Sequence, residues 1–126
     1  MRLAAAALGM ALALAPVARA ARAPSADELA LAGSWRIESE DGKRRCALRL
    51  TAKPIPAGLV LEQPTPCADP YFNIQRVAAW KITRGGLVFV TITGSQMAAF
   101  RPDGAVFASS SAPASILRRL GTEKAL

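Results

Sequence analysis

The sequence contains no histidine, only two cysteines and only seven aromatic residues among its 126 residues. Without an imidazole, the chain can form neither a Ser-His-Asp nor a Cys-His catalytic site, because both need a base that titrates near neutral pH. A zinc site with histidine ligands is also excluded, and two cysteines alone cannot complete a closed zinc site. We therefore expect no metal centre and no cofactor of the chain's own. The length corresponds to a single domain.

The longest apolar run lies at the N-terminus. Arg2 provides a positive start, residues 3–15 are apolar, and the small residues Ala18 and Ala20 stand at the −3 and −1 positions of a cleavage site. This layout is typical of a secretory signal peptide, and the run is shorter than the roughly 20 residues that a membrane span needs. We expect residues 1–20 to be removed on export. An uncleaved N-terminal anchor is the alternative.

Export changes what the two cysteines are expected to do. In an oxidising compartment Cys46 and Cys67 are expected to form a single disulfide. Closing that loop would stabilise the fold by roughly 3 kcal/mol in the chain-entropy model. Two free thiols or a redox pair are the alternatives, although the spacing is far from that of a C-x-x-C motif.

The charge is unbalanced toward Lys and Arg, with a formal net charge of +7. Without residues 1–20, 14 Lys and Arg remain against 9 Asp and Glu, which leaves +5. The basic residues form two short clusters, 43–45 and 118–119. Nucleic-acid binding would need a basic stripe interleaved with stacking aromatics. The aromatics here fall instead at positions expected in the core, namely Trp35, Trp80, Phe89, Phe100 and Phe107. We therefore expect a basic surface and no nucleic-acid partner, with an anionic partner surface as the alternative.

From Gly33 onward, apolar residues recur at every second position, as in half-buried strands. Turn residues divide this part of the chain into eight short segments. The expected strands cover residues 35–38, 46–50, 59–61, 77–82, 87–93, 96–100, 105–109 and 116–120. Residues 53–56 (Lys-Pro-Ile-Pro) are expected to break the strand pattern, and residues 68–75 could hold one short helix. The pattern predicts an all-β antiparallel sandwich or barrel, whose interior is filled by side chains or holds one small ligand.

The expected mature chain opens with residues 21–24, which show no periodicity. Ser25 and Glu28 then have the spacing of a capping box. A short helical turn follows, and Gly33 is expected to end it. The sequence therefore predicts a short extended arm attached to a helical turn, with a disordered tail as the alternative.

The carboxylates nearest to one another in the sequence are Glu38, Glu40 and Asp41, beside a turn. A pair of acids could perform acid–base chemistry of the glycosidase type. A solvated hairpin end is the expected arrangement, because nothing in the sequence places an apolar wall against one of them to raise its pKa. We therefore do not expect an enzyme.

Several short motifs follow one another in a characteristic order. They are Pro24-Ser25-Ala26-x-Glu28-Leu29, Gly33-x-Trp35, Cys46-x-Leu48-x-Leu50, Cys67, Trp80, Gly86-Leu87, and Gly94 before a strand that ends at Phe100. From about residue 24 to residue 120, this order resembles the small periplasmic inhibitors of serralysin-type (alkaline) zinc metalloproteases. The resemblance implies an eight-stranded antiparallel lipocalin-like barrel with a short N-terminal helical turn and one disulfide.

The resemblance also implies how the chain is divided and where it acts. Residues 21–32 would form the arm and helical turn, residues 33–120 the barrel, and residues 121–126 a C-terminal tail. The protein would be a periplasmic monomer, with no membrane contact once the signal peptide is removed. Its partner would be a secreted zinc metalloprotease of the serralysin type.

The mechanism implied by the resemblance depends on the arm. The arm, Ala21-Arg22-Ala23-Pro24-Ser25, would enter the primed subsites of the protease cleft. The α-amine of Ala21 would approach the catalytic zinc and displace its activated water. An amine binds a metal only when neutral, and an α-amine titrates near pH ~7.7–8.0, so it loses its proton readily at neutral or alkaline pH. The alternative function is an exported barrel that binds a small apolar ligand.

Overall fold

The computed structural model describes residues 22–121, which form eight strands and one short helix. The expected signal peptide, Ala21 at the head of the arm, and residues 122–126 lie outside the described residues. The elements in chain order are α1 (Ala26–Leu31), β1 (Gly33–Ser39), β2 (Arg45–Ile55), β3 (Gly58–Glu62), β4 (Ala79–Thr83), β5 (Gly86–Val90), β6 (Gln96–Asp103), β7 (Val106–Ser109) and β8 (Ser115–Arg119). No helix in this part of the chain is long and apolar enough to cross a membrane.

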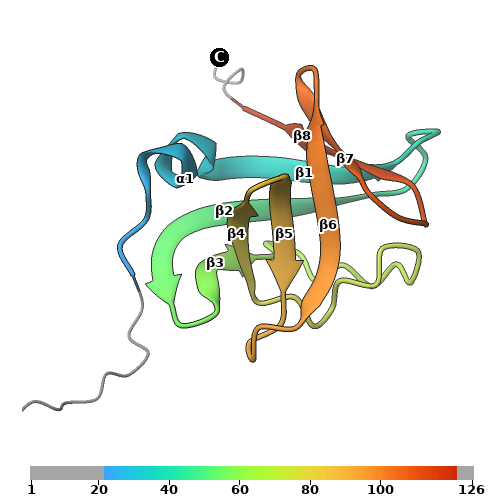
Figure 1. Cartoon of the computed structure of the whole chain (residues 1–126). Helices are drawn as coiled ribbons and strands as arrows, with labels where there is room; N and C mark the ends of the chain where they lie inside the picture. Colours follow the sequence, from blue (N-terminus) through green and yellow to red (C-terminus); the bar gives the residue numbers. More distant parts are fainter. Residues whose placement is uncertain (1–21, 122–126) are drawn as a thin grey trace, which may run out of the picture.

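The strands form one closed antiparallel barrel (Figure 1). Each strand pairs with the next, and β1 also pairs with β8, so that Ile37 on β1 stands between Cys46 on β2 and Leu117 on β8. Closure leaves no unpaired sheet edge. The predicted eight-stranded antiparallel barrel is therefore confirmed.

Alternate residues of the strands fill the barrel. Trp35 and Ile37 of β1 and Leu48 and Leu50 of β2 are buried, as the alternation predicts. The further apolar residues of the main core are Leu59, Leu61, Cys67, Phe72, Ile74, Val77, Trp80, Leu87, Phe89, Phe100 and Leu117. An eight-stranded barrel is just wide enough for its side chains to meet. The packed aromatics and leucines occupy the space that a carrier protein would keep for a ligand.

The second strand continues where the sequence predicts a break. β2 runs through Lys53 and Pro54 to Ile55, so the expected interruption is wrong for residues 53–55, and the strand ends before Pro56, which lies in a turn. The pairing of β2 with β3 shifts register between Leu50 and Pro54. Pro54 comes directly after this shift, where it pairs with Leu59 of β3.

Beyond the bulge, the β2–β3 turn reaches over the outer face of the barrel. Ile55 and Ala57 pack against Ala79, Val88 and Val90, which form a second, smaller apolar cluster on β4 and β5. This contact fixes the turn beside the N-terminal arm (Figure 1).

The connection between β3 and β4 contains turns and no helix, so the helix considered for residues 68–75 is wrong. The predicted disulfide between Cys46 and Cys67 is present and joins this connection to β2. The side-chain amide of Gln63 donates to the carbonyl of Ile74 and accepts from the N–H of Cys67, each over 2.9 Å. These cross-links hold the connection in place of helical hydrogen bonds.

Candidate functional site

The N-terminal arm leads into α1 without joining any helix or strand (Figure 1). In its described part, residues 22–25, Arg22 and Ala23 are exposed and Pro24 is half-buried. Ala21, which would carry the free amine, lies outside the described residues. The arm thus reaches the barrel surface beside α1 and the β2–β3 turn.

The first end of α1 is closed by the predicted capping box. Ser25 is the N-cap, and its hydroxyl accepts the N–H of Glu28 over 3.1 Å. In return, the Glu28 carboxylate accepts the N–H of Ser25 over 2.9 Å. Such reciprocal bonds satisfy two N–H groups that a helix start leaves free. The base of the arm is therefore held by hydrogen bonds within the first turn of α1.

The other end of α1 is held from the barrel. The guanidinium of Arg119 donates to the carbonyls of Ala30 and Ala32, each over 2.9 Å. The indole N–H of Trp35 donates to the carbonyl of Leu31 over 2.8 Å. The helix ends at Leu31 with Ala32 as its C-cap, and Gly33 follows the cap directly, the position at which a glycine was expected to end the helix.

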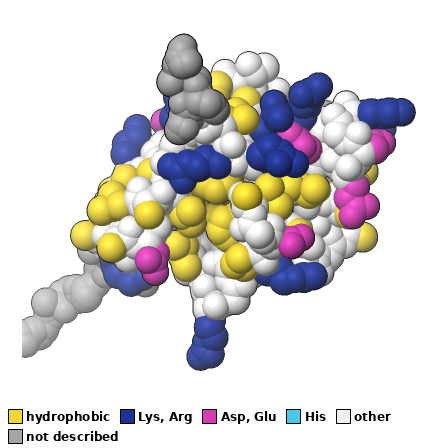
Figure 2. Space-filling model, turned by 90° about the horizontal axis from the view of Figure 1, so that it is seen from above, with side chains coloured by type: hydrophobic (Ala, Val, Ile, Leu, Met, Phe, Trp, Pro, Cys, Tyr) yellow, Lys and Arg dark blue, Asp and Glu magenta, His cyan; other side chains and the backbone are white. Residues whose placement is uncertain are grey.

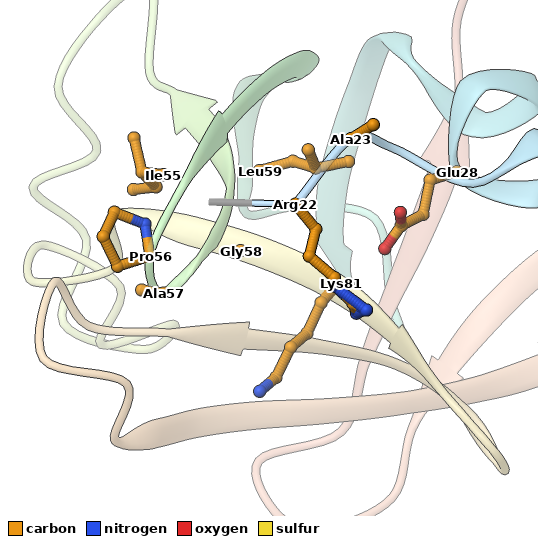
Figure 3. Close-up of a pocket in the computed structure, with 9 residues that line it drawn as sticks. All are labelled: Arg22, Ala23, Glu28, Ile55, Pro56, Ala57, Gly58, Leu59 and Lys81. Carbon is orange, nitrogen blue, oxygen red and sulfur yellow. The ribbon is translucent and has the colours of Figure 1, made fainter. Parts of the chain in front are cut away.

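A hollow of about 210 Å³ lies between the arm and the barrel. Arg22 and Ala23 line it from the arm, residues 55–59 from the β2–β3 turn, and Lys81 from β4. Figure 3 shows the side chains of Arg22 and Lys81 at the same hollow, with the Glu28 carboxylate at the start of α1. The surface beside the arm therefore carries two positive charges and one negative charge.

A larger and more apolar hollow, of about 470 Å³, lies at the end of the barrel that α1 partly covers. Ala30 and Leu31 of α1, residues 82–86 at the β4–β5 turn, Pro102 and Phe107 line it. Phe107, which the sequence places in the core, is only partly buried here. Figure 2 looks onto the molecule from above and shows hydrophobic side chains gathered on this face, with Lys and Arg side chains around them.

The cluster of carboxylates near the first turn does not form a paired acid site. Glu38 is buried, so the expected solvated position is wrong for this residue. Its carboxylate oxygen Oε2 forms an ion pair with Nε of Arg36 over 2.6 Å. The same oxygen lies 3.6 Å from Nε of Arg118. Glu40 is exposed. Glu38 is therefore a structural partner of two arginines on the barrel wall.

Asp41 acts as a turn residue. Its carboxylate accepts the N–H of Lys43 over 2.9 Å and the hydroxyl of Ser39 over 2.7 Å. These hydrogen bonds, first that of Lys43, hold the pKa of Asp41 below its usual value. Among residues 22–121, no group of three or more Cys, Asp or Glu side chains is placed to hold a metal ion.

One basic cluster has a role that was not predicted from the sequence. Arg118 and Arg119 were expected on a basic surface, whereas Arg118 faces Glu38 and Arg119 holds the end of α1. One local signal was available, because α1 has no basic residue in its own last turn. A helix end without such a residue leaves its carbonyls to be satisfied from elsewhere.

The comparisons with known proteins identify the chain at the level of its family. A family model described as "Protease inhibitor Inh" matches residues 25–117. The chain belongs to the Inh family of protease inhibitors. The sequence-based resemblance to the inhibitors of that family is thereby confirmed, and an Inh protein is an inhibitor rather than an enzyme.

Solved structures agree on the fold. Five chains of known structure match, and one is the "Crystal structure of a psychrophilic marine protease MP inhibitor". It is 16% identical, the alignment covers 74% of this chain and 98% of that chain, and the TM-score is 0.52. At this identity the likeness shows a common fold. No curated protein matches the sequence.

The Inh match begins at Ser25, so the described arm residues Arg22 to Pro24 precede it. It ends at Leu117, so Arg119 follows it. The two parts that meet at α1, the arm and the end of β8, therefore lie just outside the region that the family model matches.

Proposed function

We propose that this Inh protein is exported and inhibits a secreted zinc metalloprotease of the serralysin type by inserting its N-terminal arm into the active-site cleft. Family membership supports a protease as the partner. The motif order in the sequence supports the metalloprotease class. The proposal assigns inhibition to residues 21–25 and leaves the barrel as the scaffold that presents them.

The observation that carries this proposal is the contrast between the arm and its base. Arg22 and Ala23 are exposed and belong to no regular element. The next residues enter a helix whose first end is closed by Ser25 and Glu28 and whose last carbonyls are bound by barrel side chains. An exposed segment on a fixed base can enter a cleft with less loss of conformational freedom than a free tail.

The chemistry of the arm follows from its position at the new N-terminus. Cleavage after Ala20 would give Ala21 a free α-amine, and that amine would coordinate the protease zinc in its neutral form. An α-amine near pH ~7.7–8.0 loses its proton far more readily than a lysine near pH ~10.4. Proline at position 24 limits the arm to extended conformations, which suit a substrate-like cleft.

The expected export fits the same proposal. The apolar run of residues 3–15 and the small residues before Ala21 have the layout of a signal peptide. The disulfide between Cys46 and Cys67 is of the kind that persists in an oxidising compartment. We therefore propose a periplasmic location for the mature protein.

Ligand carriage, the alternative function, has little support. The interior contains buried aromatics, with the rings of Phe89 and Phe100 only 5.0 Å apart between centroids. The apolar hollow at the end of the barrel lies beside α1 and the turns that line its rim. Because side chains fill the interior of this eight-stranded barrel, the interior offers no space to a ligand.

Titration of a serralysin-type protease with the purified mature protein tests the proposal. A variant that lacks residues 21–25 should lose at least about a hundredfold in affinity, because the arm supplies the zinc contact and the cleft contacts. One control is Ser25→Ala, which removes only the N-cap hydroxyl of α1, and a second control lacks five residues at the other end, 122–126. All three variants are checked for folding by urea unfolding. Inhibition that survives loss of the arm, in a folded protein, would reject the arm mechanism.

A further inference from the structure

Helix α1 is too short to be stable by itself. It has six residues, from Ala26 to Leu31. A helix leaves about four N–H groups and four carbonyls unsatisfied at its ends, so in a helix of this length almost every backbone group is an end group. Isolated helices shorter than about 12 residues are marginal even in favourable sequences. The stability of α1 must therefore come from its contacts.

Each of the last four carbonyls of this segment has a partner. The carbonyl of Leu29 accepts the N–H of Ala32 over 3.3 Å. The carbonyls of Ala30 and Ala32 accept from the two terminal nitrogens of Arg119, and the carbonyl of Leu31 accepts from the indole of Trp35. Three of these four hydrogen bonds thus come from two side chains of the barrel. They can form only when α1 lies against the barrel.

The two side chains are positioned by strand pairing. Trp35 on β1 stands directly opposite Arg119 on β8. The guanidinium carbon lies 5.4 Å from the centroid of the Trp35 rings, so the cation also stacks on the indole face. The positive charge of Arg119 lies at the negative end of the helix dipole, where α1 itself has no basic residue.

The glycine between the helix and β1 makes room for this arrangement. A Cβ at Gly33 would lie 3.3 Å from a terminal nitrogen of Arg119, and the φ of +143° disfavours any other residue. The backbone thus passes close beneath the guanidinium because position 33 has no side chain.

We propose that Arg119 and Trp35 clamp α1 onto the barrel and thereby fix the direction in which the arm leaves it, so that Arg119 is a positioning residue for inhibition. This inference rests on the proposed role of the arm. Arg119 lies 94 residues after Ser25 in the chain, and its two hydrogen bonds go to the last turn of α1, at Ala30 and Ala32. It acts through α1 alone.

The physical effect of the clamp is on the fraction of molecules ready to bind. If α1 unfolds locally, the arm becomes part of a longer flexible tail, and binding must order that tail again. The apparent dissociation constant rises in inverse proportion to the fraction of molecules in which α1 is formed. The loss should therefore appear mainly as slower association, without a change in the contacts of the complex.

Arg119→Met is the variant of choice because it keeps an unbranched apolar stem over Trp35 and removes both hydrogen bonds. Arg118→Met is the matched control, since it removes the same charge from the neighbouring position on β8, where the side chain faces Glu38. Arg119→Lys keeps the charge and loses the two-pronged donor. All three are compared with the unmodified mature protein against the same serralysin-type protease.

Two readouts are needed. Amide exchange by NMR at Leu29 and Ala32 reports whether α1 is formed, and the indole N–H signal of Trp35 reports its bond to Leu31. The indole signal of Trp80, which is bonded elsewhere, serves as an internal reference. Inhibition constants and association rates with the protease report how readily the arm binds.

For Arg119→Met we expect faster exchange in α1, a shifted Trp35 indole signal, and inhibition weakened by on the order of tenfold through association. In both α1 exchange and inhibition, Arg119→Lys should lie between Arg119→Met and the unmodified protein. Arg118→Met should match the unmodified protein in both. If Arg119→Met does not fold, the same two measurements on the folded Arg119→Lys variant test the proposal.

The inference is overturned if α1 exchange and inhibition are unchanged in the Arg119 variants while deletion of residues 21–25 abolishes inhibition. It is equally overturned if α1 loosens and inhibition does not weaken. If the deletion itself leaves inhibition intact, the proposed function fails, and faster exchange in Arg119→Met would then still show that the clamp holds α1.

Discussion

Trp80 on β4 donates its indole N–H to the backbone carbonyl of Thr51 on β2 over 3.0 Å, although β2 and β4 are not neighbours in the barrel. Thr51 lies in the stretch between Leu50 and Pro54 where the pairing of β2 with β3 shifts register. A fully buried core side chain thus binds a strand carbonyl at the bulge. β2 continues through Pro54 directly after the bulge, where Pro54 pairs with Leu59.

Trp80→Phe should destabilise the barrel by about 2–3 kcal/mol, because it leaves the Thr51 carbonyl unpaired and a small cavity in the core. Urea unfolding of the mature protein measures the loss. Lys81→Ala, at the exposed neighbouring position, should stay within about 0.5 kcal/mol of the parent. A Trp80→Phe variant as stable as the Lys81→Ala control would contradict the role given to this hydrogen bond.

Gly86→Ala should cost about 3 kcal/mol or more. A Cβ at this position would meet the carbonyl oxygen of Phe100 at 2.0 Å, and its φ of +154° strains any other residue. The adjacent Gly85 is a matched control, because an added Cβ there meets nothing within 4 Å. Thermal or urea unfolding should therefore separate the two variants clearly, and equal stabilities would show that the β5–β6 contact has been misread.

Replacing both cysteines by serine should lower the free energy of unfolding by roughly 3 kcal/mol, since the bridge closes a loop with a sequence separation of 21. The bridge lies at the start of β2, whereas α1 is held by other residues, so a folded variant should inhibit as the parent does. Unfolding with and without a reductant checks the first part. The reductant should lower the stability of the parent and leave that of the double variant unchanged.

Glu38→Gln should destabilise the protein by about 1–2 kcal/mol. The substitution leaves the guanidinium groups of Arg36 and Arg118 without their buried counter-charge. Glu40→Gln removes the same charge at an exposed position and should be close to neutral. A difference of less than about 0.5 kcal/mol between the two variants in urea unfolding would reject the structural role assigned to Glu38.

Inhibition should strengthen as the pH rises through the titration of the Ala21 amine. The neutral amine binds zinc, so each pH unit below about 7.7–8.0 should weaken inhibition about tenfold. Inhibition constants from about pH 6 to pH 9 check this, with substrate cleavage at the same pH values as the control for the protease's own titrations. Acetylation of the amine should remove the pH dependence together with most of the affinity. An acetylated protein that inhibits normally would exclude zinc coordination.

Local signals made much of this fold predictable. The alternation around Trp35 and Leu48 identified strands and their buried faces, because the side-chain period of a strand follows directly from its backbone. The capping box at Ser25 and Glu28 was readable for the same reason, since both partners lie within one turn. The disulfide needed only the count of cysteines and the expectation of export.

Several errors concern contacts that form only when strands pair. Pro54 continues β2 directly after a bulge, where it pairs with Leu59 of β3, and Glu38 is buried between Arg36 of its own strand and Arg118 of β8. The link from Arg119 to α1 spans nearly the whole domain. The contacts of Arg118 and Arg119 exist only once the barrel is closed, so no short window of sequence contains them.

The most direct test of the account uses a serralysin-type protease in which the catalytic zinc is replaced by cobalt(II), whose visible spectrum responds to its ligands. One equivalent of the mature protein should change that spectrum, and forms that are acetylated at Ala21 or lack residues 21–25 should not. A spectrum unchanged by the mature protein while the protease is fully inhibited would contradict the claim that the arm reaches the metal.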